Sequence, residues 1–272
     1  MTAGSEYKLL FAKADDLYAR ARKGAVAVSS FLNPAEAHYL EKYLRSNKIA
    51  DTVLFFGGYV GAMRTRAFFL PDYILDLVSG ESGEQRRRLI LAYMADDVAA
   101  AISCVRVKGS GYRVLSHRDH LGSVLALGIE RHVVGDIAVM SEHEALIFAD
   151  AKIAEFLLQT LTKIANDDVE CTPAEIGEDF TVPENVEDIT VSVASRRADC
   201  LVASLANCSR EEAVRLVKSG AVSADYEEIE DPDKRLEKET VLTIRGAGKF
   251  RVLEGETLTR RDRLRIKVQK FK

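Results

Sequence analysis

The stretch "ASRRADCLVASLANCSREEAVRLVKSGAV", from Ala194 to Val222, decides the fold of the last third of the chain. Apolar residues recur every three or four positions on both sides of "ANCS", which predicts two helices joined by a tight turn. Ser195 is the expected cap of the first helix. Ser209, with Glu212 three residues on, has the pattern of a capping box for the second. Gly220 is expected to end that helix in the left-handed conformation that glycine adopts most easily.

The helix pair is basic on one side. Arg210, Arg215 and Lys218 fall on one arc of the second helix, next to its apolar side, and Arg197 opens the first helix. An arginine side chain donates two parallel hydrogen bonds to a phosphate through its planar guanidinium group. This arc is therefore a candidate site for a polyanion, provided that the protein's own carboxylates do not hold its guanidinium groups.

Charge is unevenly distributed along the 272 residues, whose net charge is -4. From Glu187 onward there are 18 Lys and Arg against 16 Asp and Glu, and the residues before it carry 20 against 26. The stretch from Arg245 to Lys272 alone holds ten basic and three acidic residues. So concentrated a positive charge favours a polyanionic partner. The alternative is a solvated, frayed basic tail.

Size and composition are typical of a globular protein with about two domains. The four cysteines show no CxxC spacing, which indicates reduced thiols in a cytoplasmic protein. The N-terminus has no signal-peptide pattern, and no apolar run is long enough to span a bilayer. We therefore expect a soluble, cytoplasmic monomer.

The first part of the chain predicts helices followed by a hairpin. "NPAEAHYLEKYLRSN" (33–47) has a cap at Asn33 and an apolar stripe, and "TVLFFGGYVGAMRTRAFFLPDY" (52–73) has two apolar runs around a glycine-containing loop. Tyr59, Arg64 and Arg66 lie near the tip of that loop. They are candidates for stacking bases and holding phosphates, but the aromatic residues are explained more simply as core.

The middle of the chain predicts a β-α-β-β-α-β order, the ferredoxin-like arrangement shared by RNA-recognition domains. Among the strand residues only Phe148 is an aromatic suited to stacking on bases, so RNA binding by this sheet is weakly predicted. The segment 177–188 is acidic, contains Pro183 and reads as a linker. The predicted strands are 102–109, 134–141, 144–150 and 168–175, and the predicted helices are 116–129, capped by Ser116, and 152–166.

The last third also resembles a known RNA-binding module. Short motifs follow one another in the order of the S4 domain: Ser195, Arg197 and Asp199 in the first helix, Ser209 and Arg210 at the start of the second, Gly220 and Val222 after it, and "RGAGKF" from Arg245 to Phe250. Strands are expected in "AVSAD" (221–225) and "TVLTIRGAGKF" (240–250). The chain departs from the pattern at Ala198, Asp225 and Glu239-Thr240, but none of these changes removes the basic arc.

The rest of the chain extends the resemblance to one family. "FFGGYVGAMRTR", "LSHRDHLGSVLALGI" with Arg131 after it, and "GDI" at 135–137 are similar to the YlmH family of bacterial S4-domain proteins, related to the photosystem II S4 proteins. The resemblance implies a non-enzymatic factor that binds the large ribosomal subunit through its S4 domain. It further implies contacts with ribosomal RNA and tRNA, and a role in ribosome-associated quality control of stalled peptidyl-tRNA.

We thus predict an α+β fold in three parts: an N-terminal helical and hairpin segment (1–80), an RRM-like α/β domain (81–176), and an S4 domain of the αL type with a basic C-terminal tail (187–272). The predicted contacts with RNA phosphates are expected to lie on one side of the S4 motif. They are Arg197, Arg210, Arg215, Lys218 and Lys249. The predicted RNA-binding residues are Arg196, Arg197, Ser209, Arg210, Arg215, Lys218, Arg245, Lys249 and Arg251.

Catalysis is not predicted. "HRDHLG" (117–122) lacks the partner motifs of a protein kinase, so His117 and Asp119 are expected to fix a helix start. His117 and His120 lack a third metal ligand, and we predict no cofactor. Two other classes stay open: an S4-domain enzyme that modifies RNA, such as a pseudouridine synthase or methyltransferase, and a protein–protein adaptor.

Overall fold

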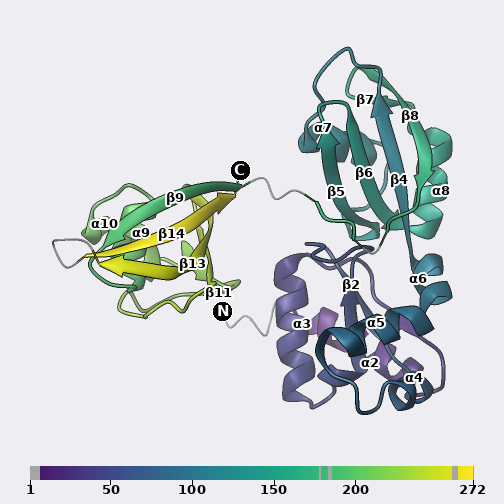
Figure 1. Ribbon diagram of the computed structural model, residues 1–272, viewed down its shortest axis with the longest axis horizontal. Coiled ribbons are helices and arrows are strands. Elements are labelled where there is room, and N and C mark those ends of the chain that lie inside the picture. The colour runs from purple at the N-terminus through teal and green to yellow at the C-terminus, as the bar shows by residue number, and fades with distance from the viewer. Residues whose placement is uncertain (1–6, 178, 183–185, 259–262, 272) are drawn as a thin grey trace. The chain divides into compact units, whose positions relative to one another are not determined.

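The computed structural model describes residues 7–177, 179–182, 186–258 and 263–271. The chain is a mixed α+β protein with three antiparallel sheets among these residues, and it divides into two compact units, Met1–Val182 and Pro183–Lys272 (Figure 1). The predicted boundary near residue 80 falls inside the first unit and stays a prediction. None of the described helices has the length and apolarity needed to cross a membrane.

The first unit begins with helices packed on a small sheet. Asn33 caps α3 (Pro34–Ser46) in a reciprocal capping box with Glu36, as expected at Asn33. The predicted hairpin is confirmed, because β2 and β3 pair antiparallel from Val53↔Phe69 to Phe56↔Arg66. The elements of this part are α2 (Lys8–Ala21), β1 (Ala27–Val28), α3, η1 (Ala50–Thr52), β2 (Val53–Phe56), β3 (Arg66–Phe69), α4 (Asp72–Leu77), α5 (Gly83–Tyr93) and α6 (Ala95–Ala101).

A five-stranded sheet forms the rest of the first unit, with the strand order β5-β6-β4-β8-β7. Its first strands and helices follow the predicted β-α-β-β-α-β order. Alternate residues such as Val105 and Ile147 pack against the helices, whereas Cys104 and Phe148 face the N-terminal part. The elements are β4 (Ile102–Gly109), α7 (His117–Ala126), η2 (Arg131–Val133), β5 (Val134–Ser141), β6 (Glu144–Asp150), α8 (Ala151–Thr160), β7 (Lys163–Ile164) and β8 (Asp167–Ala174).

Two predictions in this region are wrong. The helix expected over 152–166 ends at Thr160, because Leu161 already takes an extended conformation. Lys163–Ile164 form β7, and Ala165, with a positive φ of 50°, lies in the turn between β7 and β8. The linker expected from residue 177 begins later. Phe180 packs its ring against Tyr59 and Phe148, at centroid distances of 5.3 and 6.3 Å, so this residue belongs to the core of the first unit.

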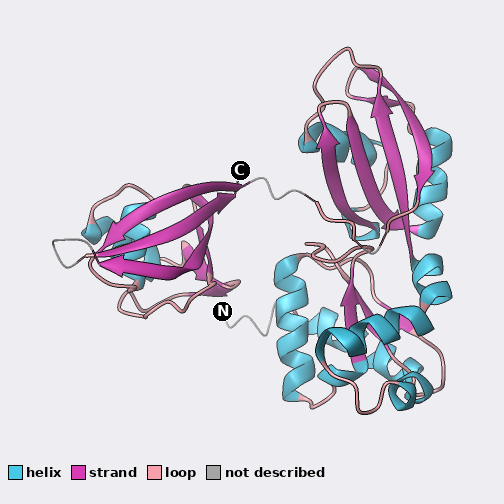
Figure 2. Cartoon of the chain, viewed as in Figure 1, coloured by secondary structure: helices cyan, strands magenta, loops and turns pink. Residues whose placement is uncertain are grey.

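The second unit is a six-stranded antiparallel sheet with two helices on one face (Figure 2). The strand order is β11-β10-β12-β13-β14-β9. Phe250 and Val252 in β13, and Ile266 and Val268 in β14, share one core with Leu201 of α9 and with α10. The elements are β9 (Val186–Val193), α9 (Ala198–Leu205), α10 (Arg210–Lys218), β10 (Val222–Ala224), β11 (Glu227–Glu228), β12 (Val241–Ile244), β13 (Gly248–Leu258) and β14 (Leu264–Phe271).

Two features of this unit differ from the prediction. "TVLTIRGAGKF" is a hairpin rather than one strand, since Gly246 and Gly248 have φ of 84° and 122° and the chain reverses between β12 and β13. The basic ending is not a frayed tail over its described part. Residues 264–271 form β14, which pairs with β13 on one side and with β9 on the other.

Candidate nucleic-acid interface

The second helix of the pair is capped at both ends. The Ser209 hydroxyl accepts a hydrogen bond from the Glu212 amide at 3.1 Å, as expected, but the Glu212 carboxylate pairs with Arg215 and does not complete the capping box. At the other end Gly220 has a φ of 69°, and the Ala221 amide donates to the Leu216 carbonyl oxygen at 3.0 Å. These bonds form the Schellman motif that glycine favours, and they fix where α10 ends.

The first helix begins differently from the prediction. Arg197, not Ser195, is its N-cap residue, and no side chain caps it. The Ala198 amide donates to the Lys234 carbonyl oxygen at 2.9 Å and the Asp199 amide to that of Pro232 at 3.0 Å. The polar loop after β11 therefore supplies the acceptors that a capping side chain would otherwise provide.

A buried carboxylate joins the two helices. Asp199 is 1% exposed and accepts hydrogen bonds from Nε and Nη2 of Arg197 at 3.1 and 2.9 Å, and from Nε of Arg210 at 2.9 Å. Burial by itself raises the pKa of Asp199, but the hydrogen bonds from Arg197 and Arg210 outweigh it and lower the pKa to about 2. Asp199 is therefore ionised at neutral pH and holds one arginine from each helix.

These ion pairs reduce the charge that the arc offers. Arg197 also pairs with Asp233, and only 35% of its side chain is exposed. Arg210 uses Nε on Asp199, and 59% of its side chain is exposed. A guanidinium has five N–H groups, so Arg210 keeps donors beyond its bond to Asp199. Arg197 is largely committed inside the protein.

Two further cations extend the arc of Arg197, Arg210 and Arg215 at the far end of α10. Lys218 is exposed in the last turn of the helix. Arg245 is exposed in the β12–β13 turn, and its amide donates to the Ala221 carbonyl oxygen at 2.8 Å, which holds this turn beside the end of α10. We call Arg197, Arg210, Arg215, Lys218 and Arg245 the helix-pair edge.

Arg196 does not belong to that edge, which corrects the prediction. Its side chain is 4% exposed, and Nε and Nη2 donate to the carbonyl oxygens of Leu236 and Glu237 at 3.2 and 3.1 Å. A buried guanidinium needs acceptors, and here the loop that packs on α9 provides them. Arg196 ties this loop to the helix and cannot reach a nucleic acid.

Lys249 and Arg251 lie on the other face of the sheet, so the expectation that Lys249 shares a side with the helix-pair cations is wrong. Side chains alternate between the faces of a strand. Because Phe250 and Val252 pack under α9 and α10, the residues between them point away from the helices. Sequence position alone grouped the "GKF" motif with the helices, but the strand places its lysine on the opposite face.

In the first unit the hairpin residues are structural. The Tyr59 hydroxyl donates to Asp136 at 2.7 Å, and the Arg64 Nε donates to the Val134 carbonyl oxygen at 3.0 Å. Arg66 donates to the Ala101 carbonyl oxygen and pairs with Asp150 at 3.0 Å. Phe148 is 1% exposed and is not available for stacking on a base. The core interpretation of these residues is the one that the structure supports.

No catalytic or metal-binding set is found among the described residues. Ser116 caps α7 in a reciprocal box with Asp119, as expected for a helix start. His120 is buried with Nδ1 2.8 Å from the Ser116 carbonyl oxygen, and burial lowers its pKa. In the part of the chain that the structure describes, no three His, Cys, Asp or Glu residues are placed to hold a metal ion.

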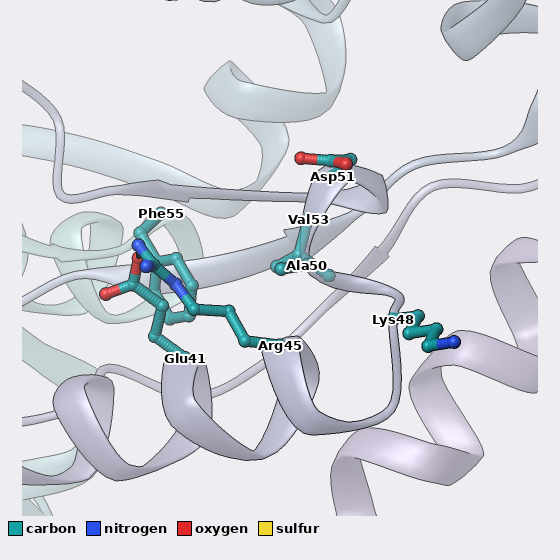
Figure 3. Close-up of a pocket in the computed structure, with 7 residues that line it drawn as sticks. All are labelled: Glu41, Arg45, Lys48, Ala50, Asp51, Val53 and Phe55. Carbon is teal, nitrogen blue, oxygen red and sulfur yellow. Dashed lines mark hydrogen bonds and ion pairs between the residues drawn. The ribbon is translucent and has the colours of Figure 1, made fainter.

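A hollow of about 430 Å³ beside α3 also lacks convergent functional groups (Figure 3). Arg45 pairs with Glu41 at 2.6 Å within the helix, and the Lys48 side chain points away from both. The remaining lining comes from Ala50, Asp51, Val53 and Phe55. We assign this hollow no function.

Comparisons with known proteins show what the chain resembles. Residues 101–178 match the family model described as "Putative RNA-binding domain in YlmH". A protein of Bacillus subtilis strain 168, named ribosome-associated protein quality control protein P2, is 28% identical over 246 residues, which are 90% of this chain and 87% of that protein. The chain is thus similar to YlmH proteins at residues 101–178. A solved structure, the cell division protein ylmH from Streptococcus pneumoniae, aligns with 66% of this chain and 98% of its own, at 18% identity and a TM-score of 0.47.

The matched YlmH segment and the helix pair are separate parts of the chain. The match covers the sheet from β4 to β8, whereas the helix-pair edge lies in the unit Pro183–Lys272. In the matched sheet the half-exposed Arg106 of β4 pairs with Glu144 of β6 at 3.0 Å. This ion pair compensates the positive charge of Arg106. The residues from β9 onward bear most of the predicted contacts.

Sequence analysis of the chain missed two groups of residues in the second unit. One is Asp199 as the shared partner of two arginines, for which the S-x-R-x-D spacing was the available signal. The other is the outward side of β14. Apolar and polar residues alternate strictly over "LRIKVQ" (264–269), which signals a strand with one buried face.

Proposed function

We propose that this chain is a non-enzymatic RNA-binding factor of the YlmH family that associates, as a monomer, with the large ribosomal subunit. The observation that carries the proposal is the Asp199 cluster, in which one buried carboxylate holds Arg197 of the first helix and Arg210 of the second at one edge. An arginine fixed in this way has lost its side-chain freedom before it meets a phosphate. The edge is thus preorganised for a phosphate backbone.

The proposal further identifies the unit Pro183–Lys272 as an S4 domain. Three observations support this identification. They are the order of elements from β9 to β13, in which a helix pair follows the first strand, the cap at Ser209, and the glycine at the end of α10. The proposed phosphate contacts are Arg210, Arg215, Lys218 and Arg245, and Arg197 supports them from the Asp199 cluster. Ser209 is the cap that orients α10.

The process and the RNA partners belong to the proposal as well. The Bacillus subtilis relative is named for ribosome-associated quality control. We propose the same role here, with ribosomal RNA of the large subunit and the tRNA of a stalled peptidyl-tRNA as ligands, in the cytoplasm. The RNA-modifying enzyme and the protein–protein adaptor stay as the alternatives.

Charge reversal at Lys218 and Arg245 tests the proposal. Both side chains are exposed and lie outside the Asp199 cluster, so Lys218→Glu with Arg245→Glu leaves that cluster intact. We expect the double variant to leave the large-subunit fraction of a sucrose gradient in which the parent protein co-sediments. A matched variant, Lys13→Glu with Lys23→Glu in the first unit, makes the same change of charge on exposed residues and should still co-sediment. Equal co-sedimentation of both double variants would contradict the helix-pair edge.

A further inference from the structure

The outward face of the second unit's sheet carries cations and aromatic rings side by side. Phe250, Val252, Ile266 and Val268 pack under the helices, so the residues alternating with them face away from α9 and α10. Cross-strand pairing places Arg251 directly opposite Gln269. We call the following residues the sheet face: Tyr226, Lys249, Arg251, Arg265, Lys267, Gln269 and Phe271.

The rings and cations of the sheet face touch. Nζ of Lys249 lies 5.0 Å from the Phe271 ring centroid and 5.3 Å from that of Tyr226, and it donates to the Tyr226 hydroxyl at 3.3 Å. Cζ of Arg251 lies 5.1 Å from the Phe271 centroid, and its Nη1 donates to Gln269 at 3.2 Å. Phe271 thus sits within reach of two cations that come from the neighbouring strand.

The described outward positions of β13 and β14 carry four cations. Arg265 and Lys267 are exposed on β14, in line with Lys249 and Arg251 on β13. Within the described register, the outward positions of β12, of β13 up to Val252 and of β14 hold no carboxylate. Carboxylates border the face at Asp188, on the edge strand β9 opposite Gln269, and at Asp225, next to Tyr226. On the helix-pair edge, by contrast, three of the arginines are engaged by carboxylates.

We propose that the sheet face binds a single-stranded segment of RNA, as a second nucleic-acid site distinct from the helix-pair edge. The inference rests on the proposed function, because it takes RNA to be the ligand of this unit. Aromatic rings hold unpaired bases by stacking, and cations between them hold the phosphates. The alternative occupant, an acidic polypeptide, would use the four cations but would leave the two rings without a role.

The test uses the full chain and a fluorescently labelled oligouridylate of about twelve nucleotides, a length that a single sheet face can hold. Binding is followed by fluorescence anisotropy. We expect Phe271→Leu, which keeps apolar bulk but removes the ring, to weaken binding about tenfold, since stacking supplies the affinity for bases. Phe271→Tyr keeps a ring and should bind like the parent. Lys267→Glu should weaken binding, whereas Lys13→Glu in the first unit should not.

The helix-pair variant separates this inference from the proposed function. Lys218→Glu with Arg245→Glu should lose the large subunit but keep the oligouridylate. Loss of the oligonucleotide in that variant, with unchanged binding by Phe271→Leu, would overturn the sheet-face site and leave the proposed function standing. An oligoglutamate peptide tests the alternative occupant. If the peptide displaces the oligonucleotide from the parent protein, and also binds Phe271→Leu as tightly as it binds the parent, the sheet face is a site for acidic polypeptides. That result would also overturn the inference.

Discussion

At the scale of the residue, Asp199 is the side chain that links the two helices, because Arg197 and Arg210 both bond to its carboxylate. A carboxylate that is 1% exposed is tolerated only because two guanidinium groups bond to it. Its pKa falls from the ordinary value of 3.8 to about 2. A depressed folded-state pKa means that the ionised carboxylate stabilises the fold above the unfolded-state pKa. This stabilisation is lost as the pH falls from about 4 to about 2.

The variant Asp199→Asn tests this stabilisation. At neutral pH we expect the variant to be less stable than the parent by about 2 kcal/mol, the equivalent of the pKa shift. The difference should shrink below pH 4, as the parent's own carboxylate becomes protonated. Urea denaturation at several pH values, followed by circular dichroism, measures it. A difference that stays constant from pH 7 to pH 2 would show that the carboxylate's charge is not what stabilises the pair.

The same variant has a second readout at the level of RNA binding. Asp199→Asn makes the protein more positive by one charge, so simple electrostatics predicts tighter RNA binding. If Asp199 instead positions Arg197 and Arg210, the variant should bind RNA more weakly despite its added charge. The measurement is the affinity of Asp199→Asn for ribosomal RNA, after circular dichroism has shown that the variant is folded. Tighter binding indicates simple electrostatics, and weaker binding indicates that Asp199 positions the two arginines.

At the scale of the element, the cap of α10 makes a separate contribution. The Ser209 hydroxyl bonds to the Glu212 amide, and the capping box is not completed. We expect Ser209→Ala to cost about 1 kcal/mol of stability, the usual loss for one capping bond. Ser204→Ala, an exposed position inside α9, should leave stability unchanged or slightly higher because alanine favours a helix. Coinciding urea transitions for Ser209→Ala and the parent would contradict the capping role.

The sequence predicted the ends of α10, because hydrogen bonds between residues close in the sequence determine where this helix begins and ends. The cap at Ser209 and the end at Gly220 depend on bonds within a few residues, and both were predicted from the sequence. The start of α9 depends on the loop carbonyls of Pro232 and Lys234, more than thirty residues away, which no local pattern reveals. Arg196 and Arg197 show the same limit. The two are adjacent and alike in sequence, yet that distant loop buries the first and leaves the second about one-third exposed, paired with Asp199 and Asp233.

At the scale of the whole molecule, cations that are close together in the sequence lie on different surfaces of the second unit. The chain carries a net charge of -4, yet the second unit presents cations both along its helix pair and on the outward face of its sheet. The sequence predicted one basic surface because it counts residues along the chain. The helices and the β12–β13 turn carry one group of cations, whereas alternation along β13 and β14 points Lys249, Arg251, Arg265 and Lys267 to the opposite side of the sheet.

The salt dependence of RNA binding counts the contacts of the whole molecule. If Arg210, Arg215, Lys218 and Arg245 neutralise four phosphates of a folded RNA, log affinity against log salt should fall with a slope of roughly -3. Lys218→Gln with Arg245→Gln removes two contacts without adding negative charge, so the slope should flatten to roughly -1.5. The measurement is filter binding of a ribosomal RNA fragment across a salt series. A parent slope near zero would mean that phosphates contribute little. An unchanged slope in the double variant would mean that the counterions are released elsewhere, with the sheet face as the next surface to probe.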